Sequence, residues 1–234
     1  MKVDKLFPGL KRSVDGDYVL DGDLTSGEMI EIDLDDRLVV RGRVITDKAL
    51  LVRRGIKAGC GIKAGWSINA GCDIEAGCDI KADESIKAGR GIKAGESIKA
   101  GCGIKAGDGI EASLIIKAGE GIEAGCDITA GWSIFAGSII KAGEGVKAGL
   151  GIKAGGCIMA GESIESSDGI IAGESIASGS FISSGKRIFV GVSIYQTGND
   201  CDKTIRCTEL RDGEICYGDL ILTGSEEKPD STQH

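Results

Sequence analysis

Residues 56–73 read IKAGCGIKAGWSINAGCD, three six-residue units that each begin with isoleucine and continue with alanine two positions later. The same aliphatic position recurs every six residues from Ile56 to Ile194, which gives 24 consecutive hexads. Val146 is the one substitution in this series. Alanine fills the second position after the aliphatic in the first 18 hexads, and the next residue is nearly always glycine. The unit is therefore I-x-A-G-x-[G/S/D].

A period of six does not match the 3.6-residue turn of an α-helix, and one glycine in each unit would cost a helix about 1 kcal/mol every time. Short strands explain the pattern, because isoleucine and alanine then share one face and the residue between them points the other way. Glycine serves as the corner residue. Repetition coils the chain into a β-solenoid, in which each strand stacks on its counterpart one coil away.

This pattern resembles the hexapeptide-repeat β-helix family over residues 56–198. The resemblance implies an all-β fold: a single-stranded parallel β-helix of triangular cross-section, with 18-residue coils of three hexads each. The small residue lies two positions after the aliphatic, whereas the family places it two positions before, so the handedness stays open. A short N-terminal segment, RLVVRGRVI, is similar to bactofilin-type polymer-forming β-helices.

The chain divides into four expected segments. Residues 1–55 are expected to form an N-terminal cap and irregular first coils, because their strand-like runs are unevenly spaced and poor in glycine. Residues 56–198 form the repeat solenoid, and residues 199–224 a C-terminal β cap with a turn at 211–213. Residues 225–234 are expected to be a disordered tail. Caps are expected at both ends because a bare solenoid end exposes unpaired strand edges.

The residue after each isoleucine points outward and is lysine at 11 of the 24 positions. With 18-residue coils these residues fall into columns, of which one reads Lys57, Glu75, Lys93, Glu111, Thr129, Lys147, Glu165 and the next reads Lys63, Lys81, Lys99, Lys117, Phe135, Lys153. The first column predicts a ladder of attracting charges. Lysines repel one another in the second, so we expect acids such as Glu84 and Glu120 to compensate them.

Four outward apolar residues form the candidate interaction site: Leu114, Trp132, Phe135 and Leu150. Three of them recur at the interval of one coil and stack on one edge, and Phe135 lies just past the corner from Trp132. An aromatic flanked by leucines on a solenoid surface has no core to enter, so this edge is expected to contact a partner. Burial under another segment of the same chain is the alternative. Apolar outward residues nearer the end of the repeat are expected to be covered by the C-terminal segment: Met159, Ile171, Phe181, Phe189 and Tyr195.

The chain offers little catalytic chemistry. Its single histidine is His234, whereas hexapeptide-repeat acyltransferases and the related carbonic anhydrases act through histidines in or beside the coils. An enzyme of the acyltransferase type is therefore disfavoured, and we expect no catalytic residue, metal or cofactor. Nine cysteines without an export signal favour free thiols in the cytoplasm, and no apolar run is long enough to span a membrane. Whether Cys60 and Cys78, which lie one coil apart in this scheme, form a disulfide stays open.

These observations favour a non-catalytic β-solenoid scaffold or protein-interaction module that self-associates as a homodimer. No membrane partner is expected, and direct nucleic-acid binding is disfavoured, because the net charge is −8 and glutamates are interspersed among the lysines. The alternative from another class is a DNA or charge mimic, of phage or mobile-element origin, that inhibits a nucleic-acid enzyme. A mimic needs acidic rows along one face, whereas the excess acid lies in residues 199–234, with nine acidic and four basic groups.

Overall fold

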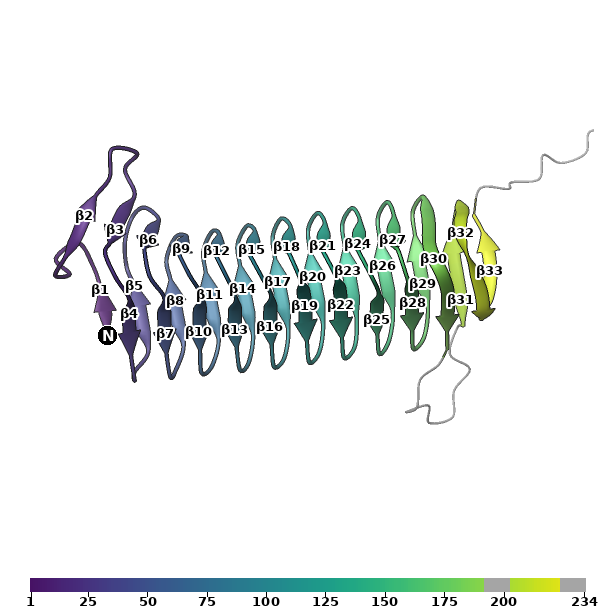
Figure 1. Cartoon of the computed structure of the whole chain (residues 1–234), viewed down its shortest axis with the longest axis horizontal. Helices are drawn as coiled ribbons and strands as arrows, with labels where there is room; N and C mark the ends of the chain where they lie inside the picture. The colour runs from purple at the N-terminus through teal and green to yellow at the C-terminus, as the bar shows by residue number, and fades with distance from the viewer. Residues whose placement is uncertain (192–202, 224–234) are drawn as a thin grey trace, which may run out of the picture.

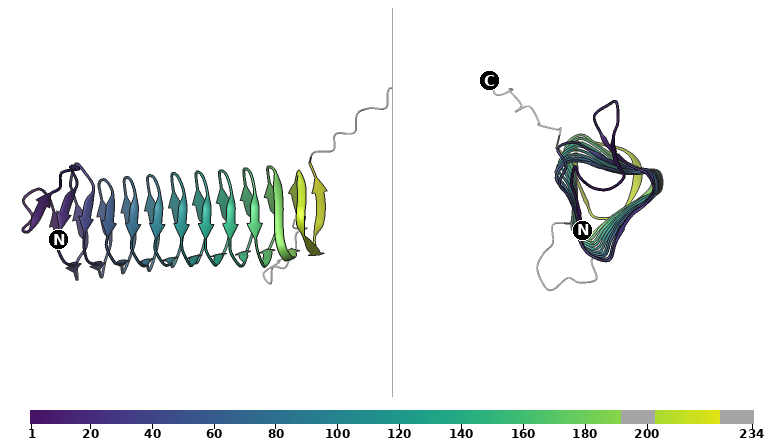
Figure 2. Two further views of the ribbon diagram at one scale, coloured as in Figure 1. Left: turned by 45° about the horizontal axis from the view of Figure 1, so that its top comes forward. Right: turned by 90° about the vertical axis from the view of Figure 1, so that its left-hand side faces the viewer.

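The computed structural model describes residues 1–191 and 203–223, which form a rod of stacked coils (Figure 1). Viewed along its axis the rod is triangular (Figure 2). Neighbouring coils pair in parallel, and equivalent hexad residues lie opposite one another, as in the series Ile62, Ile80 and Ile98. The predicted all-β parallel β-helix with 18-residue coils is thereby confirmed. Among the described residues no helix could cross a membrane.

Each full coil contributes to three faces. Face 1 contains β1 (Lys2–Val3), β5 (Ile30–Ile32), β8 (Leu50–Val52), β11 (Ile68–Ala70), β14 (Ile86–Ala88), β17 (Ile104–Ala106), β20 (Ile122–Ala124), β23 (Ile140–Ala142), β26 (Ile158–Ala160), β29 (Ile176–Ser178), β31 (Thr204–Cys207) and β33 (Asp219–Leu222). Face 2 contains β3 (Tyr18–Leu20), β6 (Leu38–Val40), β9 (Ile56–Ala58), β12 (Ile74–Ala76), β15 (Ile92–Ala94), β18 (Ile110–Ala112), β21 (Ile128–Ala130), β24 (Val146–Ala148) and β27 (Ile164–Ser166). Face 3 contains β4 (Leu24–Ser26), β7 (Val44–Thr46), β10 (Ile62–Ala64), β13 (Ile80–Ala82), β16 (Ile98–Ala100), β19 (Ile115–Ala118), β22 (Ser133–Ala136), β25 (Ile152–Ala154) and β28 (Gly169–Ala172). Two long strands, β30 (Phe181–Val190) and β32 (Glu209–Tyr217), run across faces 2 and 3, and β2 (Leu10–Arg12) lies at the N-terminal end.

The isoleucine and alanine of each hexad point inward, and one continuous core extends from Val3 to Cys207. The hexad isoleucines of the described strands are 0–1 % exposed. Burying such a side chain is worth about 1.5–3 kcal/mol relative to leaving it in water. The repeat therefore builds its core without aromatic residues.

Glycine follows alanine because neighbouring coils approach too closely for a side chain. A Cβ on Gly77 would lie 2.1 Å from the carbonyl oxygen of Gly59, one coil earlier. Apart from Gly191 at the end of the repeat, the described hexad glycines at this position do not have positive φ, so close approach and not a left-handed backbone is what excludes other residues. The last hexad position accepts aspartate because its side chain caps the next coil: Asp73 Oδ1 accepts the Gly91 N–H at 3.0 Å.

The stack begins well before residue 56. The first coil, β3 to β5, pairs with the second at a slightly longer offset, as Tyr18 does with Leu38, because residues 33–37 form a longer corner in which Leu34 is buried. Ion pairs with the same offset join the two coils: Asp17–Arg37, Asp21–Arg41, Asp23–Arg43, Glu28–Lys48 and Asp33–Arg53. Residues 1–55, expected as a cap with irregular first coils, thus contain one longer coil followed by a regular one.

The first residues of the chain close the N-terminal end of the rod. β1 pairs in parallel with β5, β2 pairs antiparallel with β3, and Phe7 and Leu10 pack against the core. Asp35 accepts hydrogen bonds from Lys5 Nζ and from the Tyr18 hydroxyl, both at 2.8 Å. These two bonds hold the pKa of Asp35 well below its usual range. The N-terminal end of the rod is therefore fixed by charged contacts as well as by strands.

The C-terminal strands add a further coil to the stack. The expected turn at 211–213 is wrong: β32 continues through these residues and pairs in parallel with β30. Ile205 pairs with Ile176 and so takes the place predicted for Ile194, which lies outside the described residues, as does the expected tail at 225–234. In the described part of the chain no strand pairs with the outer edges of β32 and β33, and Leu220 and Leu222 are exposed there. At this end the expected cap is a last coil with an open edge.

Candidate interaction surface

The corner between faces 2 and 3 carries one outward side chain per coil. From Cys60 onward these residues are Cys60, Cys78, Glu96, Leu114, Trp132, Leu150 and Asp168. The Trp132 N–H donates to the Leu114 carbonyl at 2.9 Å, and the Leu150 N–H donates to the Trp132 carbonyl at 2.6 Å. The three apolar residues are therefore consecutive in the stack, with acids beyond each end.

Three of the four residues of the predicted interaction site lie at this corner, and Phe135 lies on the adjoining face 3. Trp132 is 53 % and Leu150 50 % exposed, while Leu114 is half-buried. Phe135, on β22 of face 3, is 38 % exposed and pairs with Lys117 on one side and Lys153 on the other. These four residues are called the corner patch. Since half of the Trp132 side chain stays exposed, no described segment buries it.

Sequence reasoning missed two apolar residues on the outside of the repeat, one at this corner and one at another. Ile115, half-buried, follows Leu114 at the same corner and pairs with Ser133. Trp66 is 52 % exposed and occupies the same hexad position as Trp132, but it lies on the corner between faces 3 and 1, where Glu84 stacks on it. Counting hexads three to a coil gives this placement directly, since the interval from Trp66 to Trp132 is not a whole number of coils.

The predicted charge ladder of face 2 is confirmed. Three ion pairs join neighbouring coils: Lys57–Glu75 at 3.0 Å, Lys93–Glu111 at 2.8 Å and Lys147–Glu165 at 3.1 Å. The expected compensation on face 3 is wrong. Glu84 accepts a hydrogen bond from the Ser67 hydroxyl at 2.9 Å, and within the described residues neither Glu84 nor Glu120 forms an ion pair with a face 3 lysine.

Apolar side chains near the end of the repeat are covered in part, as expected. The Arg211 guanidinium lies 3.6 Å from the Phe181 ring centroid, and Phe189 pairs with Tyr217 of β32. Met159 and Ile171 are half-buried, and Tyr195 lies outside the described residues. The C-terminal coil thus shields this end of the rod and leaves the corner patch uncovered.

The repeat cysteines that the structure describes are free thiols. The Cys78 N–H donates to the Cys60 carbonyl at 2.9 Å, which places the two residues in neighbouring coils as predicted, and both thiols are free. Burial raises the pKa of the Cys78, Cys126 and Cys157 thiols, which lowers the share of reactive thiolate. No group of three potential metal ligands occurs in residues 1–191 and 203–223.

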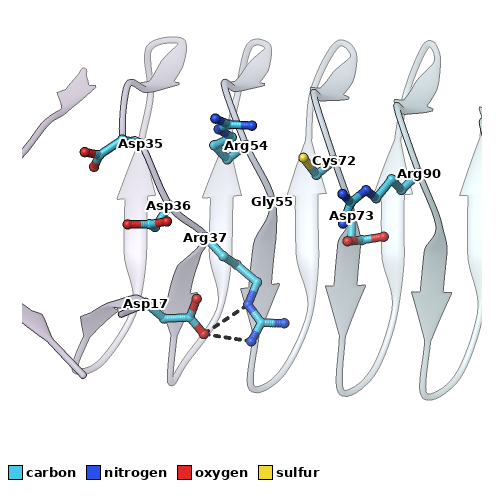
Figure 3. A pocket seen from close by; sticks show the side chains of 9 residues that line it. All are labelled: Asp17, Asp35, Asp36, Arg37, Arg54, Gly55, Cys72, Asp73 and Arg90. Atoms are coloured by element: carbon cyan, nitrogen blue, oxygen red, sulfur yellow. Dashed lines mark hydrogen bonds and ion pairs between the residues drawn. The ribbon is translucent and has the colours of Figure 1, made fainter. Parts of the chain in front are cut away.

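A shallow hollow lies along the corner between faces 1 and 2 near the N-terminus (Figure 3). Arg37 donates from Nε and Nη2 to Asp17 at 3.2 and 2.7 Å. Arg54 and Arg90 flank Cys72 farther along the corner, and three further acids line the same hollow: Asp35, Asp36 and Asp73. The charges of opposite sign in this hollow offset one another.

Comparisons of the chain with protein-family models, curated proteins and solved structures find no match. The likeness to hexapeptide-repeat proteins and to bactofilins is therefore a resemblance of pattern.

Proposed function

We propose that this chain is a non-catalytic β-solenoid scaffold that contacts a second copy through the corner patch. The observation that carries the proposal is the contiguous exposure of Trp132, Phe135 and Leu150 on a rod whose inward layer is already fully packed. Exposed tryptophan surrounded by aliphatic side chains is the composition typical of the energetic centre of protein interfaces.

A second copy fits this surface because the patch lies on a straight corner. Two rods that meet there across a two-fold axis bury Trp132 and Leu150 of each copy against the same patch of the other. Such a contact is closed and stops at the dimer. The charge-mimic alternative gains no support from the described faces, since face 2 alternates in sign and face 3 presents lysines.

The test is the molar mass of the full chain, measured by light scattering during size-exclusion chromatography. We expect the wild type to be a dimer or larger and Trp132→Glu to lose this contact and elute as a monomer. Trp66→Glu is the matched control, because Trp66 has the same hexad position and the same exposure on another corner. A monomeric wild type, or an oligomer that Trp132→Glu leaves intact, rejects the proposal.

A further inference from the structure

Face 3 carries a row of five lysines that Phe135 interrupts once. Lys63, Lys81, Lys99 and Lys117 pair in register on consecutive coils, and Lys153 follows beyond Phe135. Adjacent strands are about 4.8 Å apart, so the row spans about 24 Å. All five lysines are exposed, and no carboxylate of the described residues lies within 4.0 Å of their ammonium groups.

On the other two faces some of the lysines pair with glutamates, although face 1 also places Lys87 opposite Lys105. Glutamates alternate with lysines on face 2 and pair with them, and on face 1 Lys105 pairs with Glu123 at 2.9 Å. On face 3 the acids of the same coils stand on the two bounding corners: Glu84, Glu96 and Glu120. Like charges on neighbouring strands destabilise a sheet. The lysine row therefore does not stabilise the fold, and its ammonium groups are available to contact a partner.

The exposed apolar residues of the described repeat lie on this face or at its two edges. Among the described residues between 30 and 191, the exposed large apolar side chains are Trp66, Trp132, Phe135 and Leu150. Trp66 stands at the corner with face 1, Trp132 and Leu150 stand at the corner with face 2, and Phe135 lies within the lysine row. Cations therefore run along the middle of a flat face that has tryptophan at both edges.

We propose that face 3 binds the surface of a lipid bilayer that contains anionic phospholipids. Lysine attracts the headgroups of such a surface, and tryptophan, phenylalanine and leucine enter its interfacial layer. A bilayer is flat and presents anionic groups across the whole width of the face. A single nucleic-acid strand would follow the lysine row and leave Trp66 and Leu150 without a contact. This inference goes beyond the proposed function and does not rest on it: Trp132, Phe135 and Leu150 would enter the bilayer in place of a second copy, so one patch makes either contact but not both at once.

Co-sedimentation with large unilamellar vesicles tests the inference on the full chain. Vesicles of phosphatidylcholine alone are compared with vesicles that also contain phosphatidylserine, at low and high salt. We expect binding only with phosphatidylserine, and less of it at high salt. The variant Lys81→Glu/Lys99→Glu should bind at least about thirtyfold more weakly, because each lysine near an anionic surface contributes roughly fivefold.

The matched control is Lys87→Glu/Lys105→Glu. It makes the same charge change on face 1, at the adjacent strands β14 and β17. It should bind as the wild type does, within about threefold, and both variants should keep the circular dichroism spectrum of the wild type. The inference is overturned if phosphatidylserine vesicles are not bound, or if both double variants weaken binding equally. Binding of a single-stranded oligothymidine in place of vesicles, lost in the face 3 variant, also overturns it. The molar mass of Lys81→Glu/Lys99→Glu separates this result from self-association, which depends on Trp132.

Discussion

The inward and outward layers of the rod are encoded by the same hexads, yet they obey different rules. Inside, isoleucine and alanine repeat with almost no variation, because each coil has to fit between two others. Outside, the sequence changes from coil to coil: charges alternate on face 2, lysines line face 3, and apolar residues gather at one corner. The inward residues that repeat without change therefore indicate the fold. The outward residues that vary, where the fold does not require them to, indicate where contacts form.

The largest expected effect is on the inward layer. Ile104→Ala should lower the free energy of unfolding by about 2–5 kcal/mol, because Ile104 is fully buried and its loss leaves a cavity between coils. Leu150→Ala, on the outward layer, should change it by less than about 0.5 kcal/mol. Denaturant unfolding compares the two, and equal losses would remove the distinction between the layers.

A smaller effect is expected at the glycine that follows alanine. Gly77→Ala should cost about 1–3 kcal/mol, because the new Cβ meets the Gly59 carbonyl oxygen and the coils have to move apart. Gly103→Ala is the control, since a Cβ there lies 3.5 Å from its nearest neighbour and should shift stability by no more than about 1 kcal/mol. If the two variants have the same melting temperature, the close approach of neighbouring coils does not explain why glycine occupies this position.

Acid should open the N-terminal end before the repeat. Among the described residues the carboxyl groups with a clearly lowered pKa are Asp21, Asp23, Glu28, Asp33, Asp35 and Glu123, and hydrogen bonds from lysine or arginine side chains are the main cause. A lowered pKa stabilises the folded state above the unfolded pKa, near 4, and this stability is lost as the pH falls through the folded pKa.

Hydrogen exchange, corrected for its intrinsic pH dependence, should therefore quicken in residues 1–35 below about pH 4 while residues 86–160 stay protected. Asp35→Asn should weaken the same end already at neutral pH, because it removes the carboxylate that Lys5 and Tyr18 hold. Uniform loss of protection along the rod would show that the ion pairs do not fix this end.

The smallest expected effect concerns the lysine row. Lys99→Glu places a carboxylate between Lys81 and Lys117 and should stabilise the rod by roughly 0.2–1 kcal/mol. The gain should shrink in high salt, which screens exposed charges. A stability loss in thermal melting would mean that the row is compensated in a way that its backbone register does not reveal.

The fold could be predicted from sequence wherever one residue pattern repeats. The isoleucine series alone implies the strands, the core and the 18-residue coil, and the structure agrees. The N-terminal coils carry leucine and valine at Leu38, Val44 and Leu50 with the same spacing of six, but they lack the alanine and glycine that made the pattern visible. Acidic and basic residues spaced like the ion pair Asp17–Arg37 are a second signal of stacked coils. Their spacing is longer than the 18-residue repeat because of the longer corner at 33–37.

The C-terminal end shows where local rules fail. Arg211-Asp212-Gly213 has the composition of a hairpin turn, yet the edge of β30 offers a parallel partner on both sides of these residues, so β32 continues as a strand whose register shifts there. Gly213, with φ of +117°, lies within that strand. Turn composition is a local preference, and pairing with an existing edge overrides it.

The candidate site was predicted in its members but not in its surroundings. The 18-residue interval predicted that Leu114, Trp132 and Leu150 stack on consecutive coils. The backbone hydrogen bonds between these residues agree with that prediction. The lysine row was expected to be neutralised, because acids occur nearby in the sequence. Those acids lie on corners, and Glu84 accepts a hydrogen bond from Ser67 there instead of pairing with a lysine. A repeat pattern does not predict side-chain geometry of this kind.

The most direct test of the account uses the two tryptophans of the chain as probes of two corners. In the variant Trp66→Phe the tryptophan fluorescence comes from Trp132 alone, and in Trp132→Phe it comes from Trp66 alone. In the single rod both side chains are about half exposed. Acrylamide quenching is measured as the protein concentration rises. The account predicts that Trp132 becomes shielded as copies assemble while Trp66 keeps its accessibility. Trp132 that stays equally accessible at every concentration would contradict it.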